Sequence, residues 1–372
     1  QIKKFNLQSE GGLPIITLEA LQKHTQKSRV NYKDQWASHP PLVEREKSLE
    51  KSPPTDYKDT KSAWSLLANP ENLQKRQSVM LYGISADELK QHDKVSDDGF
   101  MELYEEEQNK FNINDRYKGY YDQHSLPKLD LDTLAMTGTP DKENQLSFDE
   151  LFNEMITQKA EKLSQDQSDL NTLQNIQDRE IKAKHFEFDN QKYHRRKARD
   201  IIYQLQQEIK EDKEELKAHD EAIFLFFHGA TSTPDTYLSK VKKVFTNQSN
   251  AEKFSEFYIN IQKLYLLLQG IESDEDFNYV NGELNRLETS IKTFLKSPEG
   301  IKLRDSLTNA EFKEGVNHYM NEHLTYIQLS SFDADKFGEF FNMIQGIYEE
   351  SIPIYQISLK QLTDYQLELL EK

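Results

Sequence analysis

The chain has 372 residues, of which 36% are hydrophobic and 30% are charged, with only 13 glycines and 11 prolines, and this composition predicts an all-α protein with long exposed helical faces. The net charge of −17 argues against nucleic acid as a general partner, because binding to phosphates requires a positive field. The chain contains no cysteine, which excludes disulfides, a thiolate nucleophile and zinc held by cysteine.

Residues 11–50 are predicted to form a small helical unit. In "GGLPIITLEALQKHTQ" the apolar residues Ile16, Leu18 and Leu21 follow a glycine pair and have helical spacing. The following "SHPPLVEREKSLE" places two prolines where the first turn of a helix tolerates them.

Residues 51–145 are expected to form an irregular, acidic connecting region. Its start, "KSPPTDYKDTKSAW", is interrupted by prolines. The later part is rich in Asp, Tyr and Asn and has few apolar repeats. We therefore expect this region to lie over other parts of the molecule rather than to form a core of its own.

Residues 146–230 are predicted to form a helical hairpin with coiled-coil-like seams and a bend within residues 186–193. The residues of the two seams recur at helical spacing among Glu, Lys and Gln: Leu163, Leu170 and Leu173 in the first, and Ile202, Leu205, Ile209 and Leu216 in the second. Such seams pack either within one chain or between chains, so the oligomeric state stays open.

Residues 231–372 are predicted to form an α-helical bundle. The expected helices cover 235–247, 250–270, 274–296, 309–329, 334–349 and 354–371, and their packing face is aromatic: Phe254, Phe257, Tyr258, Tyr265, Phe337, Phe340, Phe341 and Tyr348. The longest apolar run, residues 222–230, is too short to span a bilayer, and no signal peptide is recognisable. We expect no direct membrane insertion, and the sequence assigns no compartment.

Two polar patterns invite a functional interpretation that their spacing does not favour. His318 and His323 are five residues apart, so their side chains are about 140° apart around a helix and do not chelate one ion. In "YHRRKARD", Arg195, Arg196 and Arg199 are followed by a segment with glutamates near lysines, which favours a salt-bridged helix face over a nucleic-acid patch. We therefore expect neither a metal site nor nucleic acid here.

The stretch "ASHPPLVERE", residues 37–46, has a structural and a functional interpretation. In the structural one, Ser38 caps a helix that the two prolines begin. That interpretation gives no role to His39 or Arg45.

The same residues closely resemble the Ser/Thr-His-Pro-Pro-x-x-x-Arg motif of metallopeptidase family 48, which includes the CAAX prenyl protease type and the HtpX-like heat-shock proteases. The upstream "GGLPIITLEALQKH" is similar to the helix that precedes this motif in the family, so the resemblance covers residues 11–50. It implies that His39 supports the oxyanion at the active site and that Arg45 holds the cleft together. It also implies a zinc ion bound by H-E-x-x-H and a later glutamate, acting on a protein or peptide substrate.

The sequence departs from the family because it contains no H-E-x-x-H. We expect residues 1–50 to be the C-terminal remnant of a catalytic domain whose N-terminal portion binds zinc, and residues 146–372 to bind substrate or partner. A degenerate relative is the other explanation. In either case we expect this chain alone to hold no zinc and to be inactive. The rival hypothesis is a non-catalytic α-helical protein-interaction scaffold in which the motif is a coincidence.

Overall fold

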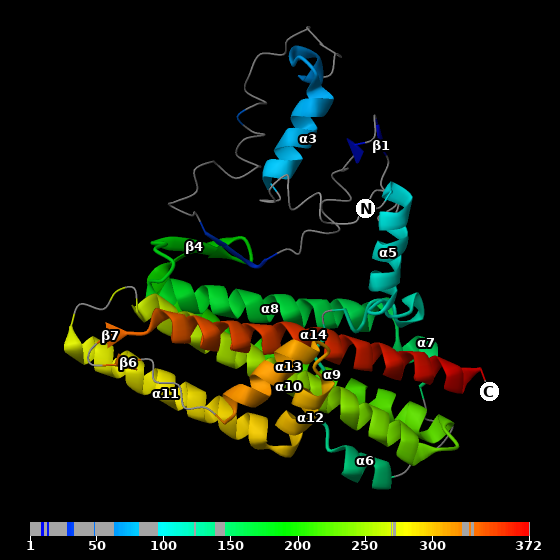
Figure 1. Cartoon of the computed structure of the whole chain (residues 1–372). Coiled ribbons are helices and arrows are strands. Elements are labelled where there is room, and N and C mark those ends of the chain that lie inside the picture. The colour runs from blue at the N-terminus through cyan, green and yellow to red at the C-terminus, as the bar shows by residue number, and fades with distance from the viewer. Residues whose placement is uncertain are drawn as a thin grey trace.

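The computed structural model describes residues 9–10, 13–14, 28–32, 48, 63–81, 96–122, 124–137, 146–268, 270, 273–321, 327–328 and 331–371. Helices dominate these residues, which confirms the predicted all-α class, and the strands among them form only small antiparallel sheets (Figure 1). The helices are α3 (Pro70–Leu81), α5 (Asp97–Asn109), α6 (Leu131–Thr137), α7 (Phe148–Leu151), α8 (Glu154–Asp178), α9 (Ala198–Ala230), α10 (Pro234–Leu268), α11 (Asp274–Lys296), α12 (Pro298–Ser306), α13 (Ala310–Tyr319) and α14 (Ala334–Leu370).

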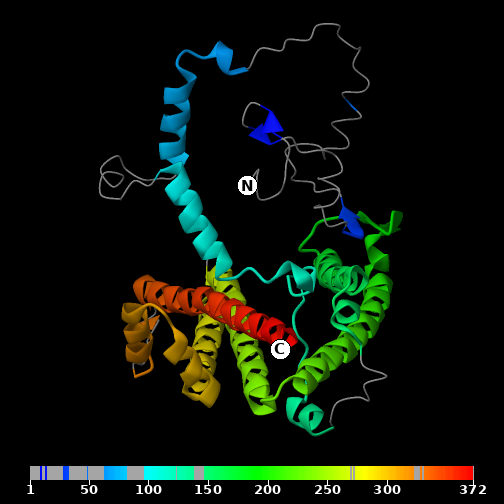
Figure 2. The same ribbon diagram turned by 90° about the vertical axis from the view of Figure 1, so that its right-hand side faces the viewer.

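The segment expected to be irregular contains several helices, although its described residues 112–114 and 124–130 have no regular structure. It holds α3, α5, α6 and two short 3₁₀ helices, Ala63–Leu66 and Asp115–Tyr117. Helix α5 begins at an N-cap, where the Ser96 hydroxyl accepts a hydrogen bond from the Gly99 N–H at 3.1 Å. The many aspartates around Ser96 make this N-cap difficult to recognise in the sequence. Figure 2 shows α5 projecting away from the body formed by the long helices.

The bend predicted within residues 186–193 is a β-hairpin. Strands β4 (His185–Phe188) and β5 (Gln191–His194) are joined by Asp189 and Asn190, whose φ angles are 49° and 63°. Two consecutive positive φ angles fit the two-residue turn that matches the twist of paired strands. A third strand, β3 (Val30–Tyr32), pairs with β4 and makes the order β3–β4–β5. The other strands are β1 (Ser9–Glu10), β2 (Leu13–Pro14), β6 (Ile327–Gln328) and β7 (Ser331–Phe332).

Two helix breaks predicted in the C-terminal half are wrong, because α10 and α14 are each continuous. Within α10, Asn250 is only 2% exposed, and the Gln248 side-chain amide donates to the Leu126 carbonyl at 2.8 Å. Both residues are therefore part of a continuous, buried helix rather than a turn, and within the described part of the chain a tertiary hydrogen bond is found for Gln248 but not for the Asn250 side-chain nitrogen. Pro353 removes one hydrogen bond from helix α14. The helix nevertheless continues through this residue, because α14 packs against α10.

The remaining predicted helices agree in part with the structure. The prediction of 274–296 coincides with α11, whereas the helix predicted for 309–329 ends at Tyr319 as α13. Helix α12 was not predicted, although Ser297 caps it and Pro298 occupies its first turn.

The buried side chains form two cores that share α10 and α14. The first core joins α7, α8 and α9 to the start of α10 and the end of α14, and the second joins the rest of α10 to α11, α12, α13 and the start of α14. All of the predicted seam residues belong to the first core, with Leu170 at its margin. Of the predicted aromatic face, Tyr265 is 47% exposed, although its ring stacks on Phe337 at 5.8 Å between centroids.

Candidate functional site

The site best defined by its contacts lies where β3 joins the hairpin between α8 and α9. Strand β3 runs antiparallel to β4, with Val30 opposite Phe188 and Tyr32 opposite Phe186. The Asp189 N–H donates to the Arg29 carbonyl at 3.0 Å and extends this pairing by one residue. A short segment near the start of the chain is thus bound as an added strand by elements about 150 residues later.

Arg29 anchors this strand through three carboxylates from different elements. Its Nε and Nη2 donate to the two oxygens of Asp189 at 2.9 and 2.8 Å, which is the bidentate geometry that suits a guanidinium. Its Nη1 donates to Glu208 on α9 at 2.7 Å and to Asp166 on α8 at 3.1 Å. The guanidinium also lies 4.6 Å from the centre of the Phe188 ring. One side chain therefore joins α8, the hairpin and α9.

A fourth carboxylate, Asp169 on α8, binds the backbone of the same segment. Its oxygens accept from the Arg29 N–H at 2.8 Å and from the Ser28 hydroxyl at 2.6 Å. Asp166 and Asp169 are each only 1% exposed. Buried carboxylates are costly unless paired, so their partners in residues 28–29 are part of what makes this end of α8 stable.

The charges around Arg29 reinforce one another. Hydrogen bonding to Asp189 raises the pKa of Arg29 further above its ordinary value, against the opposing effect of burial. The same hydrogen bond lowers the pKa of Asp189. Burial raises the pKa of Glu208, but hydrogen bonds from Arg29 and Gln204 lower it by more. Both carboxylates are thus held in their charged form, which binds the arginine most strongly.

A second polar centre fixes Tyr120 and His124 on the helical body. The Tyr120 hydroxyl donates to Asp220 Oδ1 at 2.9 Å, and His124 Nε2 lies 2.7 Å from Asp220 Oδ2. Burial, followed by the nearby Asp220 carboxylate, raises the pKa of Tyr120 far above its ordinary value, so the hydroxyl stays a donor.

The His124–Asp220 pair has the composition of a general base, because a carboxylate can orient an imidazole for proton transfer. His124 also lines two cavities of about 540 and 440 Å³. However, His124 is only 6% exposed, and Asp220 accepts from both of its neighbours. The arrangement therefore indicates a clasp that holds this segment rather than a catalytic pair.

The residues predicted from the family resemblance, His39 and Arg45, lie outside the described residues, as does Ser38. Sequence reasoning missed Arg29, although a signal for its partners was present. Asp166 and Asp169 fall within the stripe of α8 that carries Leu163 and Leu173. Acidic residues on an otherwise apolar face of a helix indicate a buried cationic or hydrogen-bonding partner.

The described residues contain no cluster of three or more His, Asp or Glu side chains arranged to hold a metal ion. No zinc-dependent step can therefore be assigned to the described side chains. Arg195, Arg196 and Lys197 form the short 3₁₀ helix that leads into α9, and Lys197 pairs with Asp200 at 3.1 Å. In the described part of the chain, no helix has the length and apolar character needed to cross a membrane.

Comparison with models of protein families, with curated proteins and with solved structures gave no match to this chain.

Proposed function

We propose that the chain is the C-terminal region of a zinc metalloendopeptidase resembling family 48, and that its helical part is a non-catalytic module that holds the peptidase-like segment in place. The observation that carries this proposal is the binding of Arg29 and β3 by α8, the hairpin and α9. Residues 28–32 lie between the two stretches that carry the resemblance, residues 11–24 and 37–46.

The position of Arg29 limits how far the motif can lie from the helical module. Arg29 is ten residues before His39. A chain of ten residues spans at most about 35 Å even when fully extended. The module would thus be held close to a catalytic cleft, where its surfaces can bind substrate or partner. The zinc ion of the intact parent would activate the water that attacks the peptide bond.

The test is cleavage of casein by the full-length product of the gene, with and without a chelator, together with its zinc content. We expect chelator-sensitive cleavage by the full-length product and none by the 372-residue chain. Arg29→Ala in the full-length product should lower cleavage without lowering the zinc content, because it detaches the segment but touches no ligand. Arg196→Ala, which removes an exposed arginine beside the hairpin, is the matched control and should change neither.

The second candidate is a protein-interaction scaffold without peptidase activity. It is favoured by the exposed apolar side chains of α5, among them Phe100 at 58% and Leu103 at 51% exposure. A folded, zinc-loaded full-length product that cleaves no casein would favour this scaffold over the peptidase. The effect of Arg29→Ala on stability would then still measure the clasp, but without a link to catalysis.

A further inference from the structure

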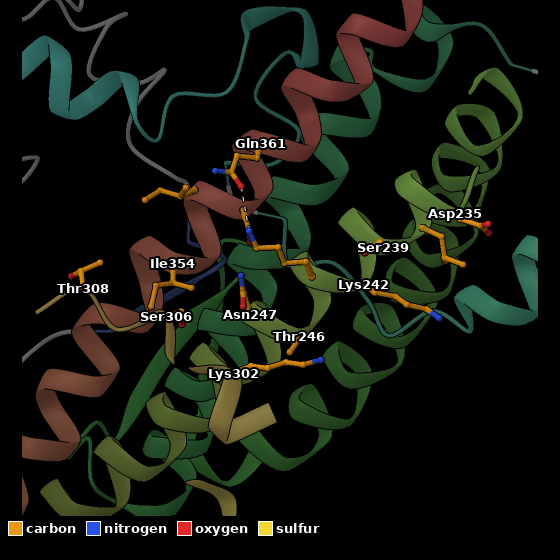
Figure 3. Close-up of a pocket in the computed structure, with 14 residues that line it drawn as sticks. Asp235, Ser239, Lys242, Thr246, Asn247, Lys302, Ser306, Thr308, Ile354 and Gln361 are labelled. Carbon is orange, nitrogen blue, oxygen red and sulfur yellow. Dashed lines mark hydrogen bonds between the residues drawn. The ribbon is translucent and has the colours of Figure 1, made fainter. Parts of the chain in front are cut away.

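A groove of about 810 Å³ runs between α10, α12 and α14 (Figure 3). Its apolar part is formed by Leu238 of α10 and by Ile354 and Ile357 of α14. Lys242 and Lys243 of α10 and Lys302 of α12 line it as well. The groove thus combines an apolar surface with three amino groups.

The groove is basic although the whole chain carries a net charge of −17. Among the residues that line it, Asp235 is the one carboxylate, against three lysines. Lys242 pairs with Asp132 at 2.6 Å, and Lys243 donates to the neutral amide oxygen of Gln361 at 3.4 Å. Among the described residues no ion pair is found for Lys302. The charge of Lys243 and Lys302 is therefore free to attract an acidic ligand that also has an apolar face.

Helix α5 has these two properties. Its sequence, "DDGFMELYEEEQN", contains six acidic residues in 13. Phe100 and Leu103 lie on one side of the helix by their spacing, with Glu107 on the same side and Glu106 on its flank. Phe100 and Leu103 are 58% and 51% exposed, so the body of the molecule does not cover this apolar side.

The length of α5 agrees with the length of the groove. At 1.5 Å per residue, the 13 residues of α5 extend over about 20 Å. The groove follows α10 from Asp235 to Asn247, which is also 13 residues and by the same rise about 20 Å.

The α5 helix of the same chain is attached on the wrong side of α14 to enter this groove. Phe111, two residues after α5, lines a cavity with Tyr355 and Leu359 of α14. Ile354 and Ile357 line the groove. Because successive residues are rotated by about 100° around a helix, these two pairs occupy opposite faces of α14. An α5 helix in the groove must therefore come from another molecule.

We propose that the groove binds α5 of a second copy of this chain, and that two copies exchange their α5 helices reciprocally. Phe100 and Leu103 contact the apolar part of the groove, and Glu106 and Glu107, which lie beside them on α5, contact Lys243 and Lys302. The exchange creates two identical contacts, as the twofold symmetry of most homodimers requires. The proposal is independent of any peptidase activity.

The experiment is sedimentation velocity of the full 372-residue chain over a range of concentrations, at low and at high salt. We expect a dimer that dissociates more readily at high salt, because the attraction is between exposed charges. The double variant Lys243→Glu with Lys302→Glu should weaken dimerisation about tenfold or more, because it places like charges opposite one another. The double variant Lys210→Glu with Lys263→Glu makes the same charge change at exposed sites outside the groove and should leave dimerisation unchanged.

A charge exchange completes the test. Glu106→Lys with Glu107→Lys in α5 should also weaken dimerisation, and combining these changes with the two groove substitutions should restore it. Thermal unfolding of each variant reports whether it is folded. A wild-type chain that stays monomeric at every concentration overturns the proposal. A dimer that the groove substitutions leave intact overturns it as well.

Discussion

The two cores of the molecule share α10 and α14 but are held together by different interactions. In the first core, buried hydrogen bonds join segments that are far apart in the sequence. The Tyr117 hydroxyl donates to the Thr363 carbonyl at 2.8 Å, and the Gln366 amide donates to the Tyr237 hydroxyl at 3.1 Å. The contacts of Asp220 with Tyr120 and His124 belong to the same core.

Aromatic rings pack in both cores, and in the second core this packing is accompanied by close approach of a side chain to the backbone. Phe254 and Phe257 meet edge to face at 5.5 Å, and the Tyr319 and Phe340 rings stack at 5.9 Å. Gly346 of α14 lies directly beneath the Phe312 ring, where a Cβ would come within 2.6 Å of it. The difference indicates that the first core is sensitive to the loss of a polar partner and the second to added volume.

The largest expected effect is in the first core. Asp220→Ala leaves the Tyr120 hydroxyl and the His124 ring buried without their acceptor, so we expect a loss of roughly 3–5 kcal/mol in the free energy of unfolding. Denaturant unfolding measures it. Asp235→Ala, at an exposed position, should change the stability by less than about 0.5 kcal/mol. Equal effects of the two substitutions would show that the buried network contributes nothing.

The second core should respond most to Gly300→Ala. A Cβ at this position would be 2.1 Å from the Phe294 carbonyl oxygen and 2.6 Å from the Leu295 Cα, so the backbone where α11 meets α12 must shift. We expect a loss of about 3 kcal/mol, measured by thermal unfolding. Gly282→Ala within α11 meets no atom within 4 Å and should stabilise the chain, by up to about 1 kcal/mol. A neutral Gly300→Ala would disprove the close contact.

A smaller effect is expected where residues 28–32 join the first core. Arg29→Ala removes one partner each from Asp166, Asp189 and Glu208, while Lys162 still pairs with Asp166. We expect a loss of about 2 kcal/mol, because Asp189 and Glu208 are partly solvated. Arg29→Lys should recover only part of this loss, since an ammonium cannot make the bidentate contact with Asp189. Full recovery with lysine would mean that charge alone holds the strand.

The smallest expected effect is that the contribution of the Arg29 ion pairs to the free energy of unfolding depends on pH. The pKa values of Asp189 and Glu208 are lowered from 3.8 and 4.5 in the folded state. Their contribution is therefore present above these ordinary values and is lost as the pH falls through the lowered ones. The difference in unfolding temperature between wild type and Arg29→Ala should be constant near pH 7 and shrink below about pH 4. A difference that grows in acid would contradict this assignment.

Sequence reasoning succeeded where local periodicity decides the structure. The boundaries of α11 and the burial of Leu205 and Leu216 follow from the spacing of apolar residues. It failed where a distant partner decides. Gln248 and Asn250 resemble a helix break until their buried environment is known, and Pro353 stays helical only because α14 packs on α10.

The candidate site follows the same rule. The hairpin turn at Asp189 and Asn190 was foreseen as a bend, but its role as an acceptor for Arg29 depends on a pairing across about 160 residues. The family resemblance directed attention to His39 and Arg45, which lie outside the described residues. Their proposed roles remain predictions.

The central claim is that the helical body clasps residues 28–32. Hydrogen exchange of individual backbone amides tests it most directly, because the Arg29 and Val30 N–H groups donate to the Asp169 carboxylate and the Ser28 hydroxyl at 2.8 and 3.1 Å. We expect slow exchange of both amides in the wild type and fast exchange in Arg29→Ala, with α11 equally protected in the two proteins. Exchange of these amides in the wild type at the rate of an unfolded peptide would contradict the clasp.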